Sequence, residues 1–370
     1  MVDLTLSYSL ADQTFNQTKS VGIFNVSVQL LENLARRLHF TRLSVFSNST
    51  LDGKLRLPTG VDIQHHNEAI HGKIARMIWD QWGVYEAAKK SGNQWLFLPK
   101  GFSSFLRPPP LKLAVYSYDA IHDFYRANYP KVISWFESQY FFQCLRYTLK
   151  HSNIIFTDSD FAKDELERLA INFKIKAPLI ITAGIGFTRG PERVIVKRNS
   201  LLVLTSVWPH KLTKRAVSYI ERWQKETGFS GSVDLVGNLP VGLRLPDLTG
   251  WRHHARLPEE TYRQFLAEAK ALLFFSAYEG FGMPPVEAMI AGTCPVFSDL
   301  PVTREVMRGR GFSFSNDSYE SFVQSMNRAL SVSARQVQLW ADQLLERHNW
   351  EKVVERVSNG LVQGENKGRI

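Results

Sequence analysis

Cysteine and long apolar runs are scarce in this sequence. Only Cys144 and Cys294 occur among 370 residues, and their wide separation excludes a small secreted fold stapled by disulfides. The longest apolar stretches, near 201–204 and 271–275, fall far short of the ~20 residues that a membrane-spanning helix needs. No basic leader precedes an apolar run at the N-terminus, so we expect no signal peptide and a cytoplasmic protein.

Acidic residues are fewer than basic ones. The chain has 35 Asp+Glu against 45 Lys+Arg, a formal net charge of +10. Such a surplus suits nucleic acid, anionic lipid or a phosphate-bearing substrate. The basic residues are scattered, and neither zinc-finger spacing nor an aromatic-basic RNA-binding signature occurs, so we expect no nucleic-acid partner.

Short apolar runs alternate with longer amphipathic ones, a pattern typical of βαβ units with parallel sheets. The first series is expected to begin with a strand over Leu4–Tyr8 and a helix over Val26–Leu38. A second series restarts at the predicted strand Leu201–Thr205, after the charged stretch Arg189–Arg198. We therefore predict an α/β protein with two Rossmann-like domains whose parallel sheets face a central cleft. The other predicted strands are Leu43–Phe46, Trp95–Leu98, Leu113–Tyr118, Asn153–Thr157, Leu179–Thr182, Ser232–Val236, Ala271–Phe275 and Cys294–Phe297. The other predicted helices are Phe161–Leu169, Lys214–Lys225, Pro258–Ala269, Pro285–Ala291 and the tail from about Ser333.

A strand, a glycine-rich loop and a helix come together over residues 271–291. Gly280 and Gly282 let the backbone approach a ligand closely, and the prolines that follow suit the first helical turn. The helix N-terminus would present free N–H groups and a partial positive charge, which suits a diphosphate. Glu279 and Glu287 are hydrogen-bond acceptors on either side of this loop, and we predict that they bind the hydroxyls of a sugar and of a ribose.

The string from Glu279 to Thr293 resembles the E-x7-E signature of retaining, GT-B-fold glycosyltransferases of family GT4, and the spacing from Glu279 to Glu287 fits. Other segments resemble the same family along nearly the full chain: Asn153–Leu166, Ala183-Gly184-Ile185, Ser298-Asp299 with Glu305, and His348-Asn349-Trp350. The resemblance implies the GT-B fold, with an acceptor domain over 1–188 and a donor domain over 189–347. It also implies a C-terminal helix, over about 348–370, that packs back on the acceptor domain.

The resemblance implies roles for residues of the donor domain. Glu287 would accept hydrogen bonds from the donor's ribose, and Glu279 would contact the transferred sugar and take part in catalysis. Lys211 would bind the diphosphate. The family's usual arginine is missing, since Thr205-Ser206-Val207 stands in its place, and Arg215 is the candidate replacement. The loop backbone expected to line the diphosphate and hexose comprises Gly280, Phe281, Gly282, Met283 and Pro284.

The N-terminal domain supplies three further candidates. Gly22 resembles the glycine that reaches the phosphate from a loop, ahead of the helix predicted to begin at Val26. His122 resembles the family's histidine near the reacting carbon, where it would orient or polarise the substrate. Asp119 lies closer to the predicted strand end and is the second catalytic candidate.

The triplet Asp158-Ser159-Asp160 has two interpretations. An Asp-x-Asp triplet binds a divalent metal in other transferases, but at a strand-to-helix junction Asp and Ser are also expected as N-caps. We favour the cap, and we expect no metal and no cofactor.

Aromatic residues concentrate among basic ones over residues 131–151. They are Trp135, Phe136, Tyr140, Phe141, Phe142 and Tyr147. A basic aromatic helix suits a lipid-linked acceptor or the inner face of the plasma membrane, whereas an ordinary core helix would have the same composition. Both interpretations remain open at this point.

The resemblance implies a metal-independent hexosyltransferase that retains anomeric configuration, of the bacterial exopolysaccharide type. We expect transfer of glucose from UDP-glucose, with GDP-mannose as the next candidate, to a hydroxyl of a sugar or lipid-linked saccharide. Lys211 and the helix N-termini would stabilise the departing diphosphate. The alternatives are a nucleotide-sugar 2-epimerase on the same fold and a non-catalytic nucleotide-sugar-binding protein.

Overall fold

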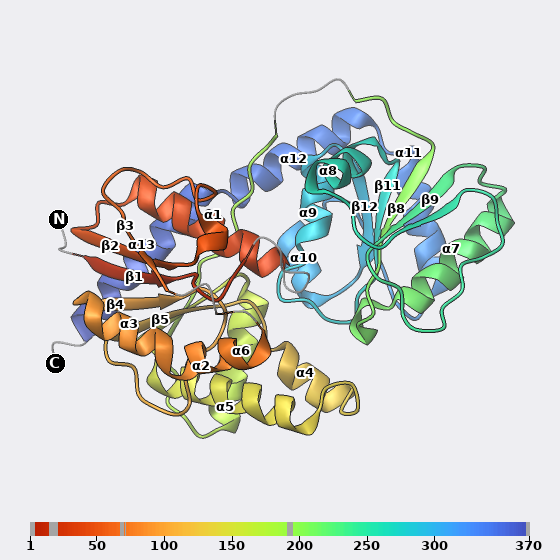
Figure 1. The fold of residues 1–370 in the computed structure, drawn as a ribbon. Helices are drawn as coiled ribbons and strands as arrows, with labels where there is room; N and C mark the ends of the chain where they lie inside the picture. Colours follow the sequence, from red (N-terminus) through yellow and green to blue (C-terminus); the bar gives the residue numbers. More distant parts are fainter. Residues whose placement is uncertain (1–3, 15–20, 67–69, 71, 191–194, 368–370) are drawn as a thin grey trace. The chain divides into compact units, whose positions relative to one another are not determined.

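The computed structural model describes residues 4–14, 21–66, 70, 72–190 and 195–367. The chain divides into two compact units (Figure 1). Unit 1 comprises residues 1–186 and 349–370, and unit 2 comprises residues 187–348. The chain therefore passes from unit 1 to unit 2 and back again.

Within the described part of unit 1, the strands form a seven-stranded parallel sheet in the order β3-β2-β1-β4-β5-β6-β7. The strands are β1 (Thr5–Ser9), β2 (Arg42–Ser47), β3 (Asp62–His65), β4 (Trp95–Leu98), β5 (Lys112–Ser117), β6 (Ile154–Thr157) and β7 (Leu179–Thr182). The central strands β4, β5 and β6 are largely buried apolar runs, as parallel strands covered on both faces must be.

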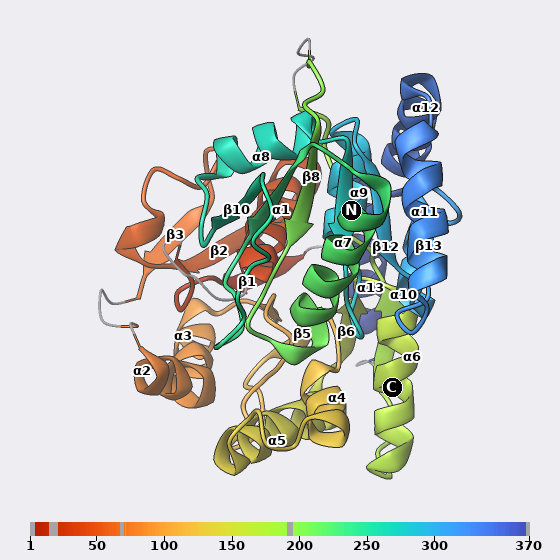
Figure 2. The same ribbon diagram turned by 90° about the vertical axis from the view of Figure 1, so that its right-hand side faces the viewer.

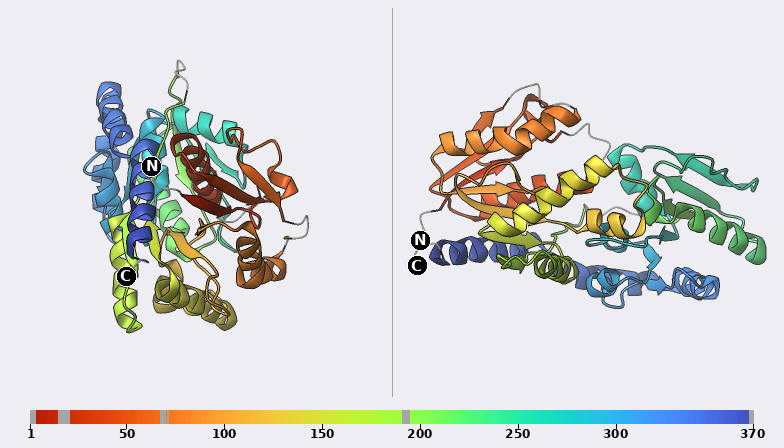
Figure 3. Two further views of the ribbon diagram at one scale, coloured as in Figure 1. Left: turned by 90° about the vertical axis from the view of Figure 1, so that its left-hand side faces the viewer. Right: turned by 90° about the horizontal axis from the view of Figure 1, so that it is seen from below.

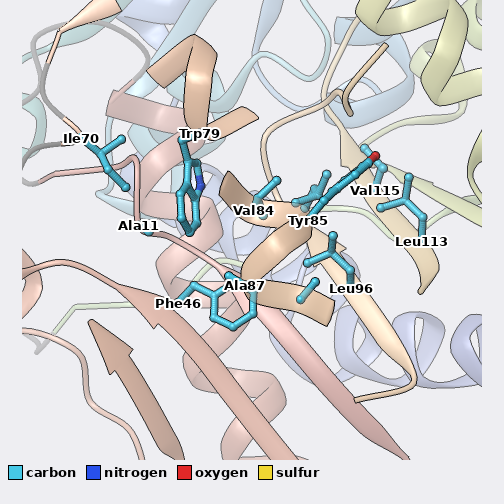
Figure 4. Close-up of a cluster of buried hydrophobic side chains, with 12 residues drawn as sticks. Ala11, Phe46, Ile70, Trp79, Val84, Tyr85, Ala87, Leu96, Leu113 and Val115 are labelled. Atoms are coloured by element: carbon cyan, nitrogen blue, oxygen red, sulfur yellow. The ribbon is translucent and has the colours of Figure 1, made fainter. Parts of the chain in front are cut away.

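Helices of unit 1 lie on both faces of this sheet (Figures 1 and 3). They are α1 (Val21–Arg37), α2 (Lys73–Ile78), α3 (Val84–Ser91), α4 (Ile121–Asn128), α5 (Trp135–His151), α6 (Asp160–Asn172) and α13 (Trp350–Lys367), with a 3₁₀ turn η1 (Ser49–Leu51) and a π-helical turn η2 (Trp79–Gly83). Figure 4 shows one part of the core, where Trp79 and Tyr85 pack with Phe46, Leu96 and Leu113.

The C-terminal helix α13 completes the core of unit 1. Trp95 on β4 donates its indole N–H to Glu365 (2.6 Å), and Arg356 donates to the backbone oxygen of Ala183 (3.0 Å). Two glycines permit this close approach, because a Cβ at Gly360 or Gly364 would lie 2.6 Å from the ring of Phe156 or Trp95, respectively. Residues 349–367 thus pack against a sheet built from the first half of the chain.

Within the described part of unit 2, the strands form a six-stranded parallel sheet in the order β10-β9-β8-β11-β12-β13. They are β8 (Ser200–Leu204), β9 (Ser232–Val236), β10 (Trp251–His254), β11 (Ala271–Phe274), β12 (Cys294–Ser298) and β13 (Phe312–Phe314). The helices are α7 (Thr213–Thr227), α8 (Glu259–Glu268), α9 (Met283–Ile290), α10 (Pro301–Met307), α11 (Tyr319–Ser331) and α12 (Ala334–Arg347), with a 3₁₀ turn η3 (Pro209–Lys211) (Figure 2). The chain order reverses between β8 and β11, the place where open α/β sheets bind ligands.

The prediction of two parallel α/β sheets is confirmed. Edge strands β3, β10 and β13 were not predicted, because they are short and the first two contain few apolar residues. The aromatic helix was expected from Lys131, but α5 begins at Trp135 because the Ser134 side chain accepts a hydrogen bond from the Glu137 backbone N–H and caps the helix there.

Candidate functional site

Two loops meet at the carboxyl ends of β8 and β11 in unit 2. The first follows β8 and contains the turn η3, and the second joins β11 to α9. They are joined through His210, whose backbone oxygen accepts hydrogen bonds from the backbone N–H of Ala277 (2.6 Å) and the hydroxyl of Ser276 (3.3 Å). The His210 side chain is buried, and burial lowers its pKa to about 4, so it is neutral at pH 7.

Lys211 and Glu279 form an ion pair between these two loops. The ammonium nitrogen of Lys211 lies 2.5 Å from a carboxylate oxygen of Glu279, whose side chain is only 12% exposed. The same ammonium lies 5.3 Å from the ring centroid of Phe274, the last residue of β11. Lys211 supplies a partly buried positive charge, which suits an anionic ligand. Glu279 beside it accepts hydrogen bonds, which suits hydroxyl groups of the same ligand.

A ring of hydrogen bonds joins the carboxyl ends of β11, β12 and β13. The Ser276 backbone N–H donates to the Ser298 hydroxyl (2.8 Å), which donates to the side-chain oxygen of Asn316 (2.7 Å). The Asn316 amide then donates to the Ser276 backbone oxygen (2.8 Å). Asn316 was not predicted as a site residue. The sequence feature that could have indicated it is its position as a polar residue just after β13, a short strand with two buried phenylalanines. This ring holds the start of the loop that carries Glu279.

The second loop ends at the N-terminus of α9. Gly282 caps this helix in the left-handed conformation (φ +81°), which favours glycine, and the prolines occupy the first turn as predicted. The helix begins at Met283, two residues before the predicted start. The Phe281 ring is buried against Phe187 and His348 (centroid distances 6.0 and 5.3 Å), so only the backbone of this residue is suited to contact a ligand. The prediction that the backbone of this loop binds the donor therefore stands for Gly280, Phe281, Gly282, Met283 and Pro284.

Glu287 lies in the second turn of α9. Burial raises its pKa to about 7; the charge of Arg263 opposes this shift and that of Glu259 adds to it. Among the described residues, no side chain donates a hydrogen bond to its carboxylate. Glu287 is therefore a half-ionised acceptor near pH 7, which suits the hydroxyls of a ribose.

Arg215, the candidate replacement for the missing arginine, lies on α7. Its guanidinium donates to the backbone oxygen of Asn316 (2.8 Å) and to the carboxylate of Asp317 (3.0 Å). It therefore anchors the segment after β13, and its role in donor binding stays a prediction.

Gly22 does not lie in a loop ahead of its helix, and that part of the prediction was wrong. Helix α1 begins at Val21, so Gly22 is in the first turn. The buried face of the helix starts early because Phe24, Val28 and Leu31 continue its apolar spacing toward the N-terminus. The preceding Lys19 and Ser20 lie outside the described residues.

Asp119 and His122 flank the start of α4 in unit 1, and each has a distinct local contact. The Asp119 carboxylate accepts a hydrogen bond from the Ile121 backbone N–H (3.0 Å) and so helps to begin the helix. The His122 ring stacks on Phe141 of α5, with centroids 3.8 Å apart and planes at 11°. Burial lowers the pKa of His122 to about 4, although Glu137 opposes the shift, so the imidazole is neutral at pH 7. The choice between the two residues as the one nearest the reacting carbon stays open.

The Asp158-Ser159-Asp160 triplet caps a helix, as predicted. The Ser159 hydroxyl accepts a hydrogen bond from the Ala162 backbone N–H, and the Asp160 carboxylate accepts one from the Thr182 hydroxyl (2.6 Å). Over the described ranges, no group of three or more His, Cys, Asp or Glu side chains could hold a metal ion.

Comparisons with known proteins identify relatives of this chain. Residues 250–340, which include Glu279 and Glu287, match the sequence model of the family described as "Glycosyl transferases group 1". The chain is 24% identical over 255 residues to the O-antigen chain mannosyltransferase RfbU of Salmonella typhimurium, which covers 66% of this chain and 68% of that protein. It is also 24% identical over 324 residues to the O-antigen chain mannosyltransferase B of Escherichia coli, which covers 78% of this chain and 82% of that protein.

Solved structures resemble the whole chain. The Anabaena HepE protein in complex with UDP and glucose has a TM-score of 0.69 at 12% identity, over 97% of this chain and 100% of that chain. The sucrose-phosphate synthase of Thermosynechococcus elongatus has the same TM-score and identity, over 97% of this chain and 98% of that chain. At this identity the two likenesses show the fold alone.

Proposed function

Since the chain is a glycosyltransferase with the GT-B fold, we propose that it is a retaining enzyme of family GT4 that moves a hexose from a nucleotide-sugar donor to an acceptor hydroxyl in polysaccharide assembly. The observation that carries the proposal is the ion pair between Lys211 and Glu279. It lies in the two loops at the chain reversal of the unit 2 sheet, and Glu279 precedes the N-terminus of α9 by four residues.

The chemistry follows from the charges in these loops. The bond between the anomeric carbon and the phosphate oxygen breaks, and the departing diphosphate gains negative charge. Lys211, the partial positive charge at the N-terminus of α9 and the backbone N–H groups that precede Pro284 stabilise that charge, since Pro284 and Pro285 themselves have no N–H. The acceptor oxygen forms the new bond on the same face of the sugar, and its proton passes to the departing phosphate. Glu279 binds hydroxyls of the transferred sugar, and Glu287 binds the ribose.

The transferred sugar is proposed from the relatives in sequence. Both proteins described above are named mannosyltransferases, so we propose mannose, supplied by GDP-mannose, as the first candidate. UDP-glucose, expected from the sequence, is the second, and HepE was solved with UDP-glucose as well as with UDP and glucose. The acceptor is a sugar or lipid-linked saccharide, and we propose that no metal is needed, since Lys211 and the α9 N-terminus supply positive charge at the diphosphate.

A panel of nucleotide sugars tests the proposal. The purified chain is incubated with GDP-mannose, UDP-glucose and other nucleotide sugars, with and without a saccharide acceptor, and nucleotide diphosphate release is measured. Acceptor-dependent release that persists in EDTA supports a metal-independent transferase. Free nucleotide and altered sugar without any acceptor would indicate an epimerase, and donor binding without any turnover would indicate a binding protein; either result overturns the proposal.

A further inference from the structure

Apolar side chains are exposed along one side of α2 and η2 in unit 1. Ile74, Ile78 and Trp82 follow one another at intervals of four residues, which places them on one helix face, and Ile74 is 75% exposed. Trp79 points the other way, into the core cluster of Figure 4. The helix therefore has a separate inward face, and its outward apolar stripe is not needed for the core.

A second group of exposed apolar side chains lies at the start of α5. Val132 precedes the helix, and Trp135 and Phe136 occupy its first turn, where they are 68% and 79% exposed. Of the two interpretations left open for this helix, the ordinary core helix does not account for these two exposed side chains.

Direct contacts hold the two groups together. The Lys73 ammonium of α2 lies 3.0 Å from the Glu137 carboxylate of α5, and the Gln81 amide of η2 donates to the Tyr140 hydroxyl (3.2 Å). Figures 1 and 2 show α2 close to α5 on the same side of unit 1. We call the combined patch the apolar surface. It consists of Ile74, Ile78, Trp82, Val132, Trp135 and Phe136.

The two segments that carry the apolar surface are rich in basic residues. Segments 72–90 and 131–150 contain seven Lys and Arg residues against three acidic ones. Each of those acids is paired: Asp80 with Lys100, Glu86 with Arg107 and Glu137 with Lys73. Lys131, next to Val132, is exposed. Lys131 therefore places a positive charge beside the exposed start of α5, in segments whose net charge is positive.

We propose that the apolar surface docks the chain onto a bilayer that contains anionic lipids. Tryptophan and phenylalanine side chains enter the headgroup region, and Lys131 with the net positive charge of the two segments attracts the negative surface. No helix within the described residues is long and apolar enough to cross a bilayer. A second copy of the chain is the less suitable occupant, because a two-fold interface would place the basic residues of both copies together. This proposal goes beyond the transfer reaction and does not depend on which donor is used.

Vesicle flotation with the full chain tests the proposal. The probes are vesicles of phosphatidylcholine alone and vesicles with added phosphatidylglycerol. We expect binding to the anionic vesicles that weakens at high salt, and that falls at least about tenfold in Trp135→Ser/Phe136→Ser and in Ile78→Ser/Trp82→Ser. The matched control is Ile171→Ser/Leu339→Ser, which removes two exposed apolar side chains on α6 and α12 and should bind as the wild type. Thermal melts of each variant check that the substitutions leave the fold intact.

Three outcomes would overturn the proposal. The first is that the wild type does not float with the anionic vesicles. The second is that the surface variants bind these vesicles no worse than the control. The third is that sedimentation velocity shows a wild-type dimer that the surface variants turn into a monomer, with vesicle binding unchanged, which would assign the surface to self-association.

Discussion

The ammonium group of Lys211 lies 2.5 Å from the carboxylate of Glu279, although the two residues come from different loops of unit 2. The pair joins the chain after β8 to the chain before α9. It brings together a cation suited to phosphate and an acceptor suited to sugar hydroxyls. Two predictions depend on this pair, and a third depends on Glu287 of α9.

Replacing Lys211 by methionine should lower kcat/KM by about 10²-fold or more, because the departing diphosphate loses a positive charge that is most valuable in the transition state. Nucleotide release from the preferred donor measures the effect. Lys214→Met, an exposed lysine on α7, is the matched control and should keep wild-type turnover. Equal turnover in the two variants would contradict a role for Lys211.

Replacing Glu279 by glutamine keeps the shape of the side chain and removes its charge. We expect turnover to fall at least about tenfold while the affinity for the nucleotide diphosphate changes little, because Glu279 is proposed to contact the sugar rather than the phosphates. Calorimetric titration measures the affinity for the nucleotide diphosphate, and a turnover assay measures kcat. The exposed Glu320→Gln variant should behave as the wild type, and an equal loss of turnover and nucleotide affinity in Glu279→Gln would argue against the assignment.

Stability should depend on pH through Glu287. Its pKa is raised by burial to about 7 in the folded chain, so the folded state holds a proton that the unfolded state has lost between about pH 4.5 and 7. Unfolding free energy therefore falls as pH rises through this window, by on the order of 1–3 kcal/mol from this group. Glu287→Gln mimics the protonated form, so it should match the wild type at pH 5 and exceed its stability at pH 8 in denaturant titrations. A constant difference between the two proteins from pH 5 to 8 would contradict the raised pKa.

His122 should not titrate between pH 6 and 8, because burial lowers its pKa to about 4. The imidazole C–H resonance, followed by NMR, should stay constant over this range, and a midpoint near 6.5 would contradict its burial. His122→Phe retains an aromatic ring on Phe141 and removes both ring nitrogens, and we expect a fall in kcat of about tenfold or more with little change in stability. Asp119→Asn can still accept the Ile121 hydrogen bond, so a larger loss in this variant than in His122→Phe would make Asp119 the residue nearest the reacting carbon.

Much of the fold could be predicted because parallel strands are buried on both faces and read as apolar runs. Ser200–Leu204 and Ala271–Phe274 are such runs, and both predicted strands are confirmed. Strands β3 and β10 are edge strands of sequence DIQH and WRHH, with partly exposed side chains, so they carry no such signal. Their place is set by pairing with a neighbouring strand, which local sequence does not encode.

The site was predictable only where backbone geometry demands particular residues. The left-handed Gly282 and the prolines after it mark the start of α9 in the sequence. The Asn316 ring was not predictable, because it depends on β12 and β13 lying side by side with Ser298 and Asn316 at their ends. The start of α1 was misplaced because Gly22 was interpreted as a loop residue, and glycine is tolerated in a first helical turn.

The glycines of α13 should be intolerant of a side chain. A Cβ at Gly360 would lie 2.6 Å from Phe156, so Gly360→Ala forces a shift of the helix or the ring and should cost about 1–3 kcal/mol of unfolding free energy. Gly190→Ala is the matched control, since no atom lies within 4 Å of its added Cβ. Chemical denaturation measures both, and equal stability of the two variants would show that α13 does not approach the sheet this closely.

The position of α13 in the chain also determines when the core of unit 1 can be completed during synthesis. Residues 187–348 form one unit that is continuous in sequence, whereas unit 1 needs residues from both sides of it. The sheet of unit 1 is translated before unit 2, yet the indole of Trp95 and the ring of Phe156 gain their contacts with α13 only when residues 349–367 follow unit 2. Part of this sheet therefore remains uncovered in the nascent chain until α13 has been made, and a ribosome that stalled after unit 2 would leave that face open to chaperones.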